Sequence, residues 1–245
     1  MLTKCKPPIY QQTKNSSIQL DSTIAENKII TDLISPYKTE LDAEMNEVLV
    51  ISSEEFKKES GKSETKLGNL VADLSFEIAN QLYQPADGDS IDFCLLNFGG
   101  LRTSLPKGPI TRGKIFELMP FENELVVVTI RNNKFIDLME YIQESGGQPI
   151  SGDIIFEYKI INNITDANAY KRSGNKRKNK NQIKIVTSDY LANGGDHMSF
   201  FLNPIKIEPL NIKLRDAIIQ YCISENKKGN QLVGKLDGRI TIEEK

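Results

Sequence analysis

The chain has 245 residues, of which 39% are hydrophobic and 26% charged, and its formal net charge is −2 at pH 7. These values are typical of a globular protein with a substantial core, and they exclude attraction to nucleic acid or membranes through overall charge. No apolar stretch approaches the roughly 20 residues that span a bilayer, and a single histidine excludes a His-rich two-metal hydrolase centre.

Residues 1–20 are expected to form an extended tail before a domain over residues 21–245. The tail is polar and contains Pro7-Pro8. Its segment Leu2-Thr3-Lys4-Cys5 is similar to the end of a bacterial lipoprotein signal, but Lys4 stands where a small residue is usual and no apolar region precedes it. Cys5 is therefore either an ordinary tail cysteine, the interpretation we favour, or the attachment point of a lipid.

The first half of the domain alternates helical and strand patterns. Apolar spacing predicts helices over 21–45, 65–83 and 111–118, and short apolar runs predict strands over 48–51 and 91–97. Pro36 is expected to break or kink the first helix, because proline removes a backbone donor. Thr111 is expected to cap the third helix.

The second half continues in the same way. It predicts strands over 125–130, 154–161, 183–187 and 239–242, and helices over 133–144 and 211–224. The strands at 154–161 and 183–187 flank a basic segment, residues 171–184, and are expected to form a long hairpin with that segment as its tip. We expect the tip to be solvated; docking to an acidic partner or an anionic lipid surface is the alternative. The interleaved but irregular connections predict a mixed, layered α/β domain.

Polar loops with paired glycines follow two of the predicted strands. After the first, Asn97 precedes Gly99-Gly100 and Arg102. Glycines allow a ligand to approach the backbone, a guanidinium suits phosphate, and an amide suits a base or sugar edge. Alone, this pattern is more often a tight turn with a solvated arginine.

The second loop, after the strand at 183–187, contains Tyr190, Gly194-Gly195 and Asp196. A tyrosine ring can stack on a base, and a carboxylate can accept hydrogen bonds from both hydroxyls of a ribose. The alternative is a surface loop in which Asn193 and Gly194 satisfy turn geometry. His197 is expected to be a polar neighbour.

A third loop, Met119-Pro120-Phe121-Glu122-Asn123, joins a helix to a strand. Phe121 follows a proline and precedes polar residues, so it is a candidate for an exposed ring that stacks on a base, although a phenylalanine there is more often in the core. Together, the three loops contain the groups that a nucleoside monophosphate requires.

Four motifs in this order resemble those of the C-terminal domain of 5′-nucleotidases. They are Leu67-Gly68-Asn69-Leu70-Val71-Ala72-Asp73, Asn97-x-Gly-Gly-x-Arg102, Met119-Pro120-Phe121-x-Asn123-x-Leu125 and Tyr190-Leu191-Ala192-Asn193-Gly194-Gly195-Asp196. One motif is a weak signal, whereas four in order are a strong one. The resemblance runs from about Asn46 to the C-terminus. It implies an α+β fold, a four-layer α-β-β-α sandwich, that binds a nucleoside or nucleoside monophosphate.

The resemblance also implies which residues contact the ligand: Asn97, Arg102, Phe121, Gly152, Tyr190 and Asp196. In the family, two aromatic rings sandwich the base, and the asparagine and the glycine lie near it. The aspartate binds the ribose, and the arginine binds the substrate.

Family members usually carry an N-terminal metallophosphoesterase domain with two metals and a catalytic Asp/His pair, and we expect this chain to act without one of its own. The resemblance therefore implies no catalytic residue and no metal or cofactor here, with hydrolysis left to a separately encoded metallophosphoesterase chain. The alternative is a non-catalytic module that binds or senses nucleosides. A third interpretation, an envelope protein without ligand binding, fits poorly with the retained polar and aromatic residues. The family implies a periplasmic or cell-envelope location.

Two positions depart from the family pattern. Ser63 precedes Glu64 where many members have arginine, and Lys62 is a candidate to supply the missing cation. Phe98 replaces a usually small residue, so it is expected either to crowd the pocket or to fill core.

Overall fold

The computed structural model describes residues 16–161, 164–171 and 181–244. The chain separates into two units, Met1–Leu41 and Asp42–Lys245. Cys5 and residues 172–180 of the basic segment lie outside the described residues. The larger unit begins at Asp42, and the domain start at residue 21 stays a prediction.

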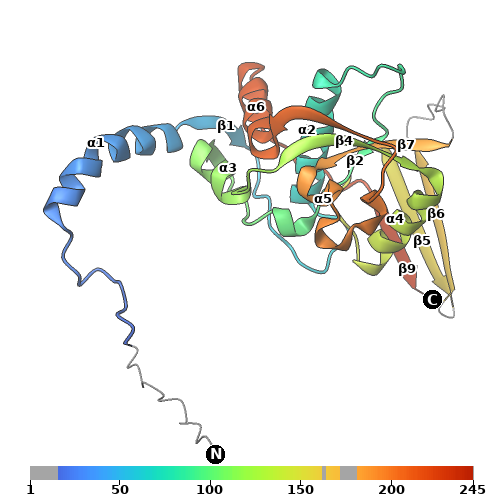
Figure 1. Cartoon of the computed structure of the whole chain (residues 1–245), viewed down its shortest axis with the longest axis horizontal. Helices are drawn as coiled ribbons and strands as arrows, with labels where there is room; N and C mark the ends of the chain where they lie inside the picture. The colour runs from blue at the N-terminus through green and yellow to red at the C-terminus, as the bar shows by residue number, and fades with distance from the viewer. Residues whose placement is uncertain (1–15, 162–163, 172–180, 245) are drawn as a thin grey trace, which may run out of the picture. The chain divides into compact units, whose positions relative to one another are not determined.

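The described residues form helices and strands that alternate along the chain (Figure 1). The helices are α1 (Lys28–Met45), α2 (Lys66–Leu82), α3 (Arg112–Leu118), α4 (Asn132–Glu144), α5 (Asp189–Ala192) and α6 (Leu214–Lys227), with short 3₁₀ turns η1 (Phe98–Gly100), η2 (Gly195–His197) and η3 (Ser199–Phe201). The strands are β1 (Val48–Ser52), β2 (Phe93–Cys94), β3 (Gly108–Thr111), β4 (Glu124–Arg131), β5 (Ile154–Ile161), β6 (Ile164–Lys171), β7 (Gln182–Ser188), β8 (Lys206–Lys213) and β9 (Ile240–Glu244).

Helix α1 runs through Pro36 without interruption, so proline does not break it. No side chain of α1 is buried. The carbonyl that loses its backbone partner at Pro36 can therefore bind water instead, which lets the helix continue. Among the described residues, no helix has the length and apolar character needed to cross a bilayer.

Threonine caps begin two of the helices. The Thr65 hydroxyl accepts a hydrogen bond from the Gly68 N–H at 2.9 Å at the start of α2. The Thr111 hydroxyl accepts one from the Lys114 N–H at 3.3 Å, which confirms the predicted cap of α3.

A four-stranded sheet, in the order β2-β7-β4-β8, forms the centre of the larger unit. Strand β4 pairs antiparallel with β7, with Val127 opposite Val186, and antiparallel with β8 on its other side. Both faces of the sheet are buried: Val127 faces the first core and Val128 the second. Continuous burial explains why 125–130 is an uncharged run that is apolar except for Thr129.

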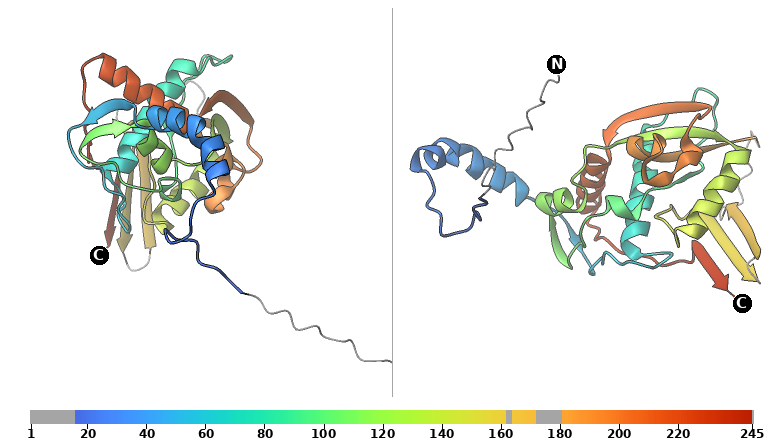
Figure 2. Two further views of the ribbon diagram at one scale, coloured as in Figure 1. Left: turned by 90° about the vertical axis from the view of Figure 1, so that its left-hand side faces the viewer. Right: turned by 60° about the horizontal axis from the view of Figure 1, so that its bottom comes forward.

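Two hydrophobic cores flank this sheet. The first contains the buried faces of α2 and α6, and the second contains those of α4 and the three-stranded sheet β6-β5-β9. Figure 2 shows β9, in red, beside β5 and β6, in yellow. The predicted α+β class, with layers in an α-β-β-α sandwich, is confirmed.

The predicted hairpin between 154–161 and 183–187 is wrong. Strand β5 pairs antiparallel with β6, Ile161 lying opposite Ile164, whereas β7 belongs to the four-stranded sheet. Strand β6 escaped detection because it is an edge strand whose residues 165–168 are exposed and polar or small. Its sequence therefore lacks the alternation that marks a half-buried strand.

Candidate functional site

Three loops meet at one edge of the four-stranded sheet. Strands β2 and β7 are parallel, so the loops that follow them leave from the same edge. Strand β4 is antiparallel to β7 and begins there, with Leu125 opposite Ser188. The turn η1, the loop before β4 and the α5–η2 segment therefore converge, although about 90 residues of sequence separate the first from the last.

A cavity of about 320 Å³ lies where these loops meet. It is lined by Asn97, Gly99, Gly100, Arg102, Phe121, Asn123, Tyr190 and Asp196. Five of the six residues expected at the ligand are thus brought together. We refer to this as the aromatic cavity.

Asp196 is the hub of the polar contacts in the aromatic cavity. The Asn97 side-chain amide donates a hydrogen bond to Oδ2 of Asp196, and the Tyr190 hydroxyl donates to Oδ1 at 2.9 Å. The Tyr141 hydroxyl, from α4, donates to the Asp196 backbone carbonyl at 2.8 Å. The first two contacts hold the carboxylate, and the third holds the backbone of the same residue. Each carboxylate oxygen has two lone pairs, so both retain capacity for a ligand hydroxyl.

The backbone around Asp196 is held in an unusual conformation. Gly194, Asp196 and His197 all have positive φ angles, of 85°, 49° and 63°. Such angles are uncommon for residues with a side chain. The Asp196 N–H also donates to the Tyr190 hydroxyl at 3.3 Å, so the same ring that lines the cavity holds this turn in place.

The Tyr190 ring lies directly against the backbone of Gly195. A Cβ atom at residue 195 would lie 2.5 Å from Cε1 of Tyr190, closer than real contacts allow. Close approach, and not a positive φ, is thus what requires glycine here. Since 47% of Tyr190 is exposed, the ring remains accessible to a ligand.

Glycines also allow close packing in the first loop. A Cβ at residue 99 would lie 3.1 Å from Oδ2 of Asp196, and one at residue 100 would lie 2.8 Å from Oδ1 of Asn97. Arg102 donates from Nη1 to the Gly99 carbonyl at 3.2 Å and is otherwise exposed. Its guanidinium carbon lies 6.0 Å from the centre of the Phe121 ring.

The loop that carries Phe121 is fastened by its neighbour Glu122. Lys213 and Arg215 both donate hydrogen bonds to the Glu122 carboxylate. These two cations lower the pKa of Glu122 to about 2, the hydrogen bond from Lys213 being the larger cause. Arg215 is itself buried and lies over the Phe116 ring at 4.2 Å. Phe121 is 39% exposed at the tip of this fastened loop.

Gly152 is the one predicted residue that does not line the aromatic cavity. Its N–H donates to Oδ1 of Asp73 at 2.9 Å, and a Cβ there would lie 3.1 Å from Nη2 of Arg239. Arg239 is 1% exposed and forms a two-pronged ion pair with Asp73, with N–O distances of 2.6 and 2.8 Å. The surroundings of Gly152 are thus a buried ion pair, and a role near a base stays a prediction.

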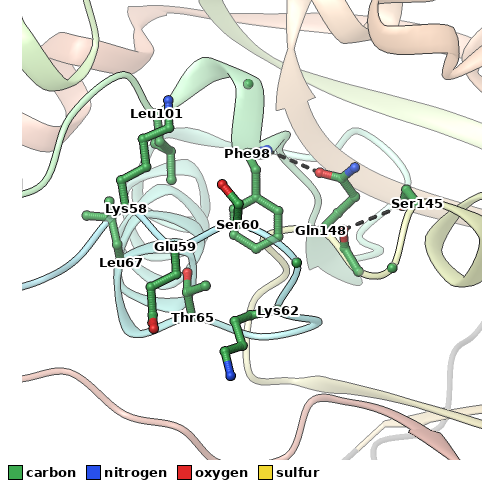
Figure 3. Close-up of a pocket in the computed structure, with 14 residues that line it drawn as sticks. Lys58, Glu59, Ser60, Lys62, Thr65, Leu67, Phe98, Leu101, Ser145 and Gln148 are labelled. Carbon is green, nitrogen blue, oxygen red and sulfur yellow. Dashed lines mark hydrogen bonds between the residues drawn. The ribbon is translucent and has the colours of Figure 1, made fainter.

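One of the two departures from the family pattern, Phe98, lies at a second cavity, and the other, Ser63, is not among the residues that line it. Phe98 does not line the aromatic cavity; its ring lies close to Gly68, where a Cβ would be 2.9 Å from Cε1. Phe98 and Lys62 instead line the neighbouring cavity drawn in Figure 3. The Ser63 hydroxyl donates to the Ile240 carbonyl at 3.3 Å.

Sequence reasoning missed three residues that contribute to the aromatic cavity. Asn123 lines it, and its side-chain amide forms no hydrogen bond with the residues that the structure describes. Tyr141 and Asp189 do not line the cavity but hold residues near it. Tyr141 donates a hydrogen bond to Asp196, and Asp189 accepts hydrogen bonds from the backbone N–H groups of Tyr190 and Glu124. The signal for Asn123 was present, because it belongs to the third motif; nothing local marked Tyr141.

The described residues contain no group of three or more His, Cys, Asp or Glu side chains placed to hold a metal ion. His197 is exposed beside Asp196. What the aromatic cavity offers is two ring faces, a carboxylate, two amides and a guanidinium.

The chain is similar in sequence to known proteins over most of its length. The sequence pattern of the 5′-nucleotidase C-terminal domain matches residues 45–203. The chain is 23% identical over 239 residues to the trifunctional nucleotide phosphoesterase protein YfkN of Bacillus subtilis, covering 92% of this chain and 16% of that protein. It is 22% identical over 259 residues to the cell wall protein Lmo0130 of Listeria monocytogenes, covering 95% of this chain and 31% of that protein.

Among solved structures, the fold resembles that of a 5′-nucleotidase precursor from Thermus thermophilus. The TM-score is 0.67 at 20% identity, over 88% of this chain and 43% of the other. The chain therefore spans less than half the length of these relatives. The sequence match over most of the chain establishes that it belongs to the 5′-nucleotidase C-terminal domain family.

Proposed function

We propose that the aromatic cavity binds a nucleoside or nucleoside monophosphate and supplies substrate recognition for phosphate-ester hydrolysis in nucleotide catabolism. The observation that carries the proposal is that Asn97, Arg102, Phe121, Tyr190 and Asp196 line one cavity. Its volume of about 320 Å³ lies at the lower end of the range for small-molecule sites.

In this proposal the rings of Phe121 and Tyr190 stack on the base. Each is partly exposed at the cavity, which leaves apolar surface that a base can cover. Asn123 reads the edge of the base, because its amide has both a donor and an acceptor to offer. Asn97 donates to Asp196 and so has less to offer the base than its position in the motif suggested.

The charges of Asp196 and Arg102 indicate which part of the ligand each residue contacts. Asp196 is a fixed acceptor, so it accepts hydrogen bonds from the ribose hydroxyls. Arg102 is exposed at the mouth of the cavity and supplies positive charge for the phosphate. We propose that the phosphate ester is cleaved by a metallophosphoesterase on a separate chain that associates with this one.

The primary test is calorimetry of the whole chain with adenosine and AMP. We expect wild type to bind both ligands, and Tyr190→Ala to bind them roughly tenfold or more weakly with the fold intact by circular dichroism. An absence of binding to either ligand refutes the proposal. A parallel assay of AMP hydrolysis with excess Mn²⁺ or Zn²⁺ is expected to show no turnover by the purified chain.

A second experiment tests the partnership. The tagged chain is isolated from the cells that produce it, and the isolate is assayed for AMP hydrolysis with Mn²⁺. Activity that accompanies the chain, and that falls when Tyr190→Ala replaces it, is expected. Nucleoside binding without accompanying hydrolysis would favour the second candidate, a module that binds or senses nucleosides.

We also propose a periplasmic or cell-envelope location. A relative over 95% of the chain is a cell wall protein. A lipid anchor at Cys5 is the accompanying hypothesis. Metabolic labelling with a fatty-acid analogue, compared between the native chain and Cys5→Ala, tests the anchor, and cell fractionation tests the location.

A further inference from the structure

Helix α1, drawn in blue in Figure 1, carries a row of large apolar side chains that are exposed. Ile30, Ile34, Tyr37 and Leu41 follow one another at spacings of four, three and four residues, so they lie along one face of the helix. Each of the four is between 48% and 73% exposed. We call this row the α1 seam. Exposed apolar side chains gathered in this way mark interaction surfaces on globular proteins.

The spacing of the α1 seam is that of a helix that pairs with a second helix. Alternation of three and four residues is the pattern of the two core positions of a coiled coil, in which each side chain of one helix packs between side chains of the other. Pro36 lies outside the seam, because it is two residues from Ile34 and one from Tyr37. The proline ring therefore does not interrupt the apolar row.

The charges beside the seam favour a second copy of this chain as the partner, with the two helices parallel. At about 100° of rotation per residue, Lys38 lies along one side of the seam and Glu40 along the other. In a parallel pair related by a twofold axis, opposite sides of the two seams meet, so Lys38 of one copy lies toward Glu40 of the other. In an antiparallel pair like sides meet, which places lysine toward lysine and glutamate toward glutamate.

The composition of α1 disfavours an anionic lipid surface as the occupant of the seam. The helix carries four acidic side chains and two basic ones: Asp32, Glu40, Asp42 and Glu44 against Lys28 and Lys38. Helices that lie on anionic lipid are instead rich in lysine and arginine on their polar face. Glu44 lies beyond the end of the seam, and its Oε1 is 3.7 Å from Nε of Arg112.

From this pattern we infer that the α1 seam is a dimer interface, through which two copies of this chain pair with their α1 helices parallel. The seam lies within the smaller unit, Met1–Leu41, and precedes residue 45, where the match to the family pattern begins. The inference therefore does not depend on the proposed function. A standard interface contains about 20–30 residues on each side. The seam is shorter, so the dimer is expected to be weak and reversible.

The first test is sedimentation velocity of the full chain over a range of concentrations. Wild type is expected to dimerise with a dissociation constant on the order of 10–100 µM. Ile34→Gln/Leu41→Gln replaces two seam residues with a good helix former and should weaken dimerisation at least tenfold. The matched control is Ser35→Gln/Thr39→Gln, which changes exposed residues on the other face of α1 and should behave as wild type. Circular dichroism checks that both variants keep their helix content.

The second test reads the direction of the two helices through charge. Lys38→Glu places glutamate toward Glu40 of the other copy and should weaken a parallel dimer roughly three- to tenfold. Lys38→Glu/Glu40→Lys exchanges the two charges and should restore the wild-type dissociation constant. A single variant that dimerises as well as wild type would overturn the parallel arrangement.

The third test is a disulfide across the seam. In a parallel pair residue 30 meets its own counterpart, so Cys5→Ser/Ile30→Cys should form a covalent dimer on mild oxidation, whereas Cys5→Ser/Thr39→Cys should not. Cys94 and Cys222 are buried and do not interfere. A chain that stays monomeric at all concentrations would overturn the inference, whichever other partner covers α1. A dimer that persists unchanged in Ile34→Gln/Leu41→Gln would also overturn it, because another surface would then form the interface.

Discussion

The backbone N–H of Glu124 donates a hydrogen bond to Oδ1 of Asp189 at 3.1 Å. The same oxygen accepts the N–H of Tyr190 at 2.8 Å. One carboxylate oxygen therefore joins the loop that carries Phe121 to the helix that carries Tyr190. The spacing of the two rings across the cavity depends on this shared acceptor.

Replacement of Asp189 is expected to weaken recognition of the base. Asp189→Ala removes the acceptor and should lower the affinity for AMP about tenfold, whereas Asp189→Asn keeps an oxygen and should retain most of it. Calorimetry with AMP and with ribose 5-phosphate measures the effect. A general structural defect would lower the affinity for both ligands, whereas a changed spacing of the rings should lower the affinity for AMP alone.

Removal of one ring is expected to reduce nucleoside affinity directly. Stacking of a base on an aromatic side chain contributes about 1–3 kcal/mol, so Tyr190→Ala should weaken adenosine binding roughly tenfold or more. Tyr190→Phe is the matched control, because it keeps the ring and removes only the hydroxyl bonded to Asp196. Unchanged affinity in Tyr190→Ala, with the fold intact, would rule out stacking.

Asp196 and Arg102 are expected to affect different ligands. Asp196→Asn should reduce the preference for adenosine over 2′-deoxyadenosine, since a carboxylate accepts from ribose hydroxyls more strongly than an amide does. Arg102→Ala should weaken the binding of AMP by about 1.5–3 kcal/mol relative to the binding of adenosine. Titration of both variants with the three ligands checks these roles. An equal loss for all three ligands in both variants would contradict them.

The stability that Glu122 contributes is expected to depend on pH. Its folded-state pKa is lowered from 4.5 to about 2 by Lys213 and Arg215, so its contribution is present above about pH 4.5 and is lost as the pH falls towards 2. Denaturation midpoints of wild type and Glu122→Gln should therefore converge over this range. The side chain is 63% exposed, so solvent screens the pair and the difference at neutral pH should be small. A difference that grows on acidification would contradict the assignment.

Arg239 is expected to be important for stability. Its guanidinium is bonded to Asp73, Asp237 and the Ile150 carbonyl while almost fully buried. Arg239→Ala should lower the free energy of unfolding by about 3 kcal/mol, because it leaves carboxylates without their partner. Chemical denaturation measures the change, with the exposed Lys235→Ala as the control. A loss no larger than that of the control would show that the pair is dispensable.

The sequence predicted those parts of the fold that depend on local patterns. The apolar run at 125–130 and the threonine cap at 111 each signal their element within a few residues. The edge strands β6 and β8 were missed, because β6 is polar and β8 contains Pro209 and exposed residues. Their pairing with distant strands supplies the order that their own sequences do not indicate.

The same distinction applies to the aromatic cavity. Paired glycines at strand ends pointed to the loops that contain Arg102 and Asp196. The contacts between loops could not be predicted, because partners such as Asn97 and Asp196 lie 99 residues apart. Gly152 illustrates the limit: its position came from the family pattern, and its actual partners, Asp73 and Arg239, are distant in sequence.

The packing of Tyr190 on Gly195 has a consequence for how this site can vary among relatives and in engineered libraries. Residue 195 can change only together with residue 190, since any side chain at 195 occupies the space of the ring at 190. A library that randomises Tyr190 alone is expected to return other aromatic residues and smaller side chains, all of them packed against Gly195. A library that randomises Gly195 alone is expected to return almost only glycine. Covariation between these two positions across many relatives would therefore reveal lineages that have exchanged the stacking ring for another means of holding the base.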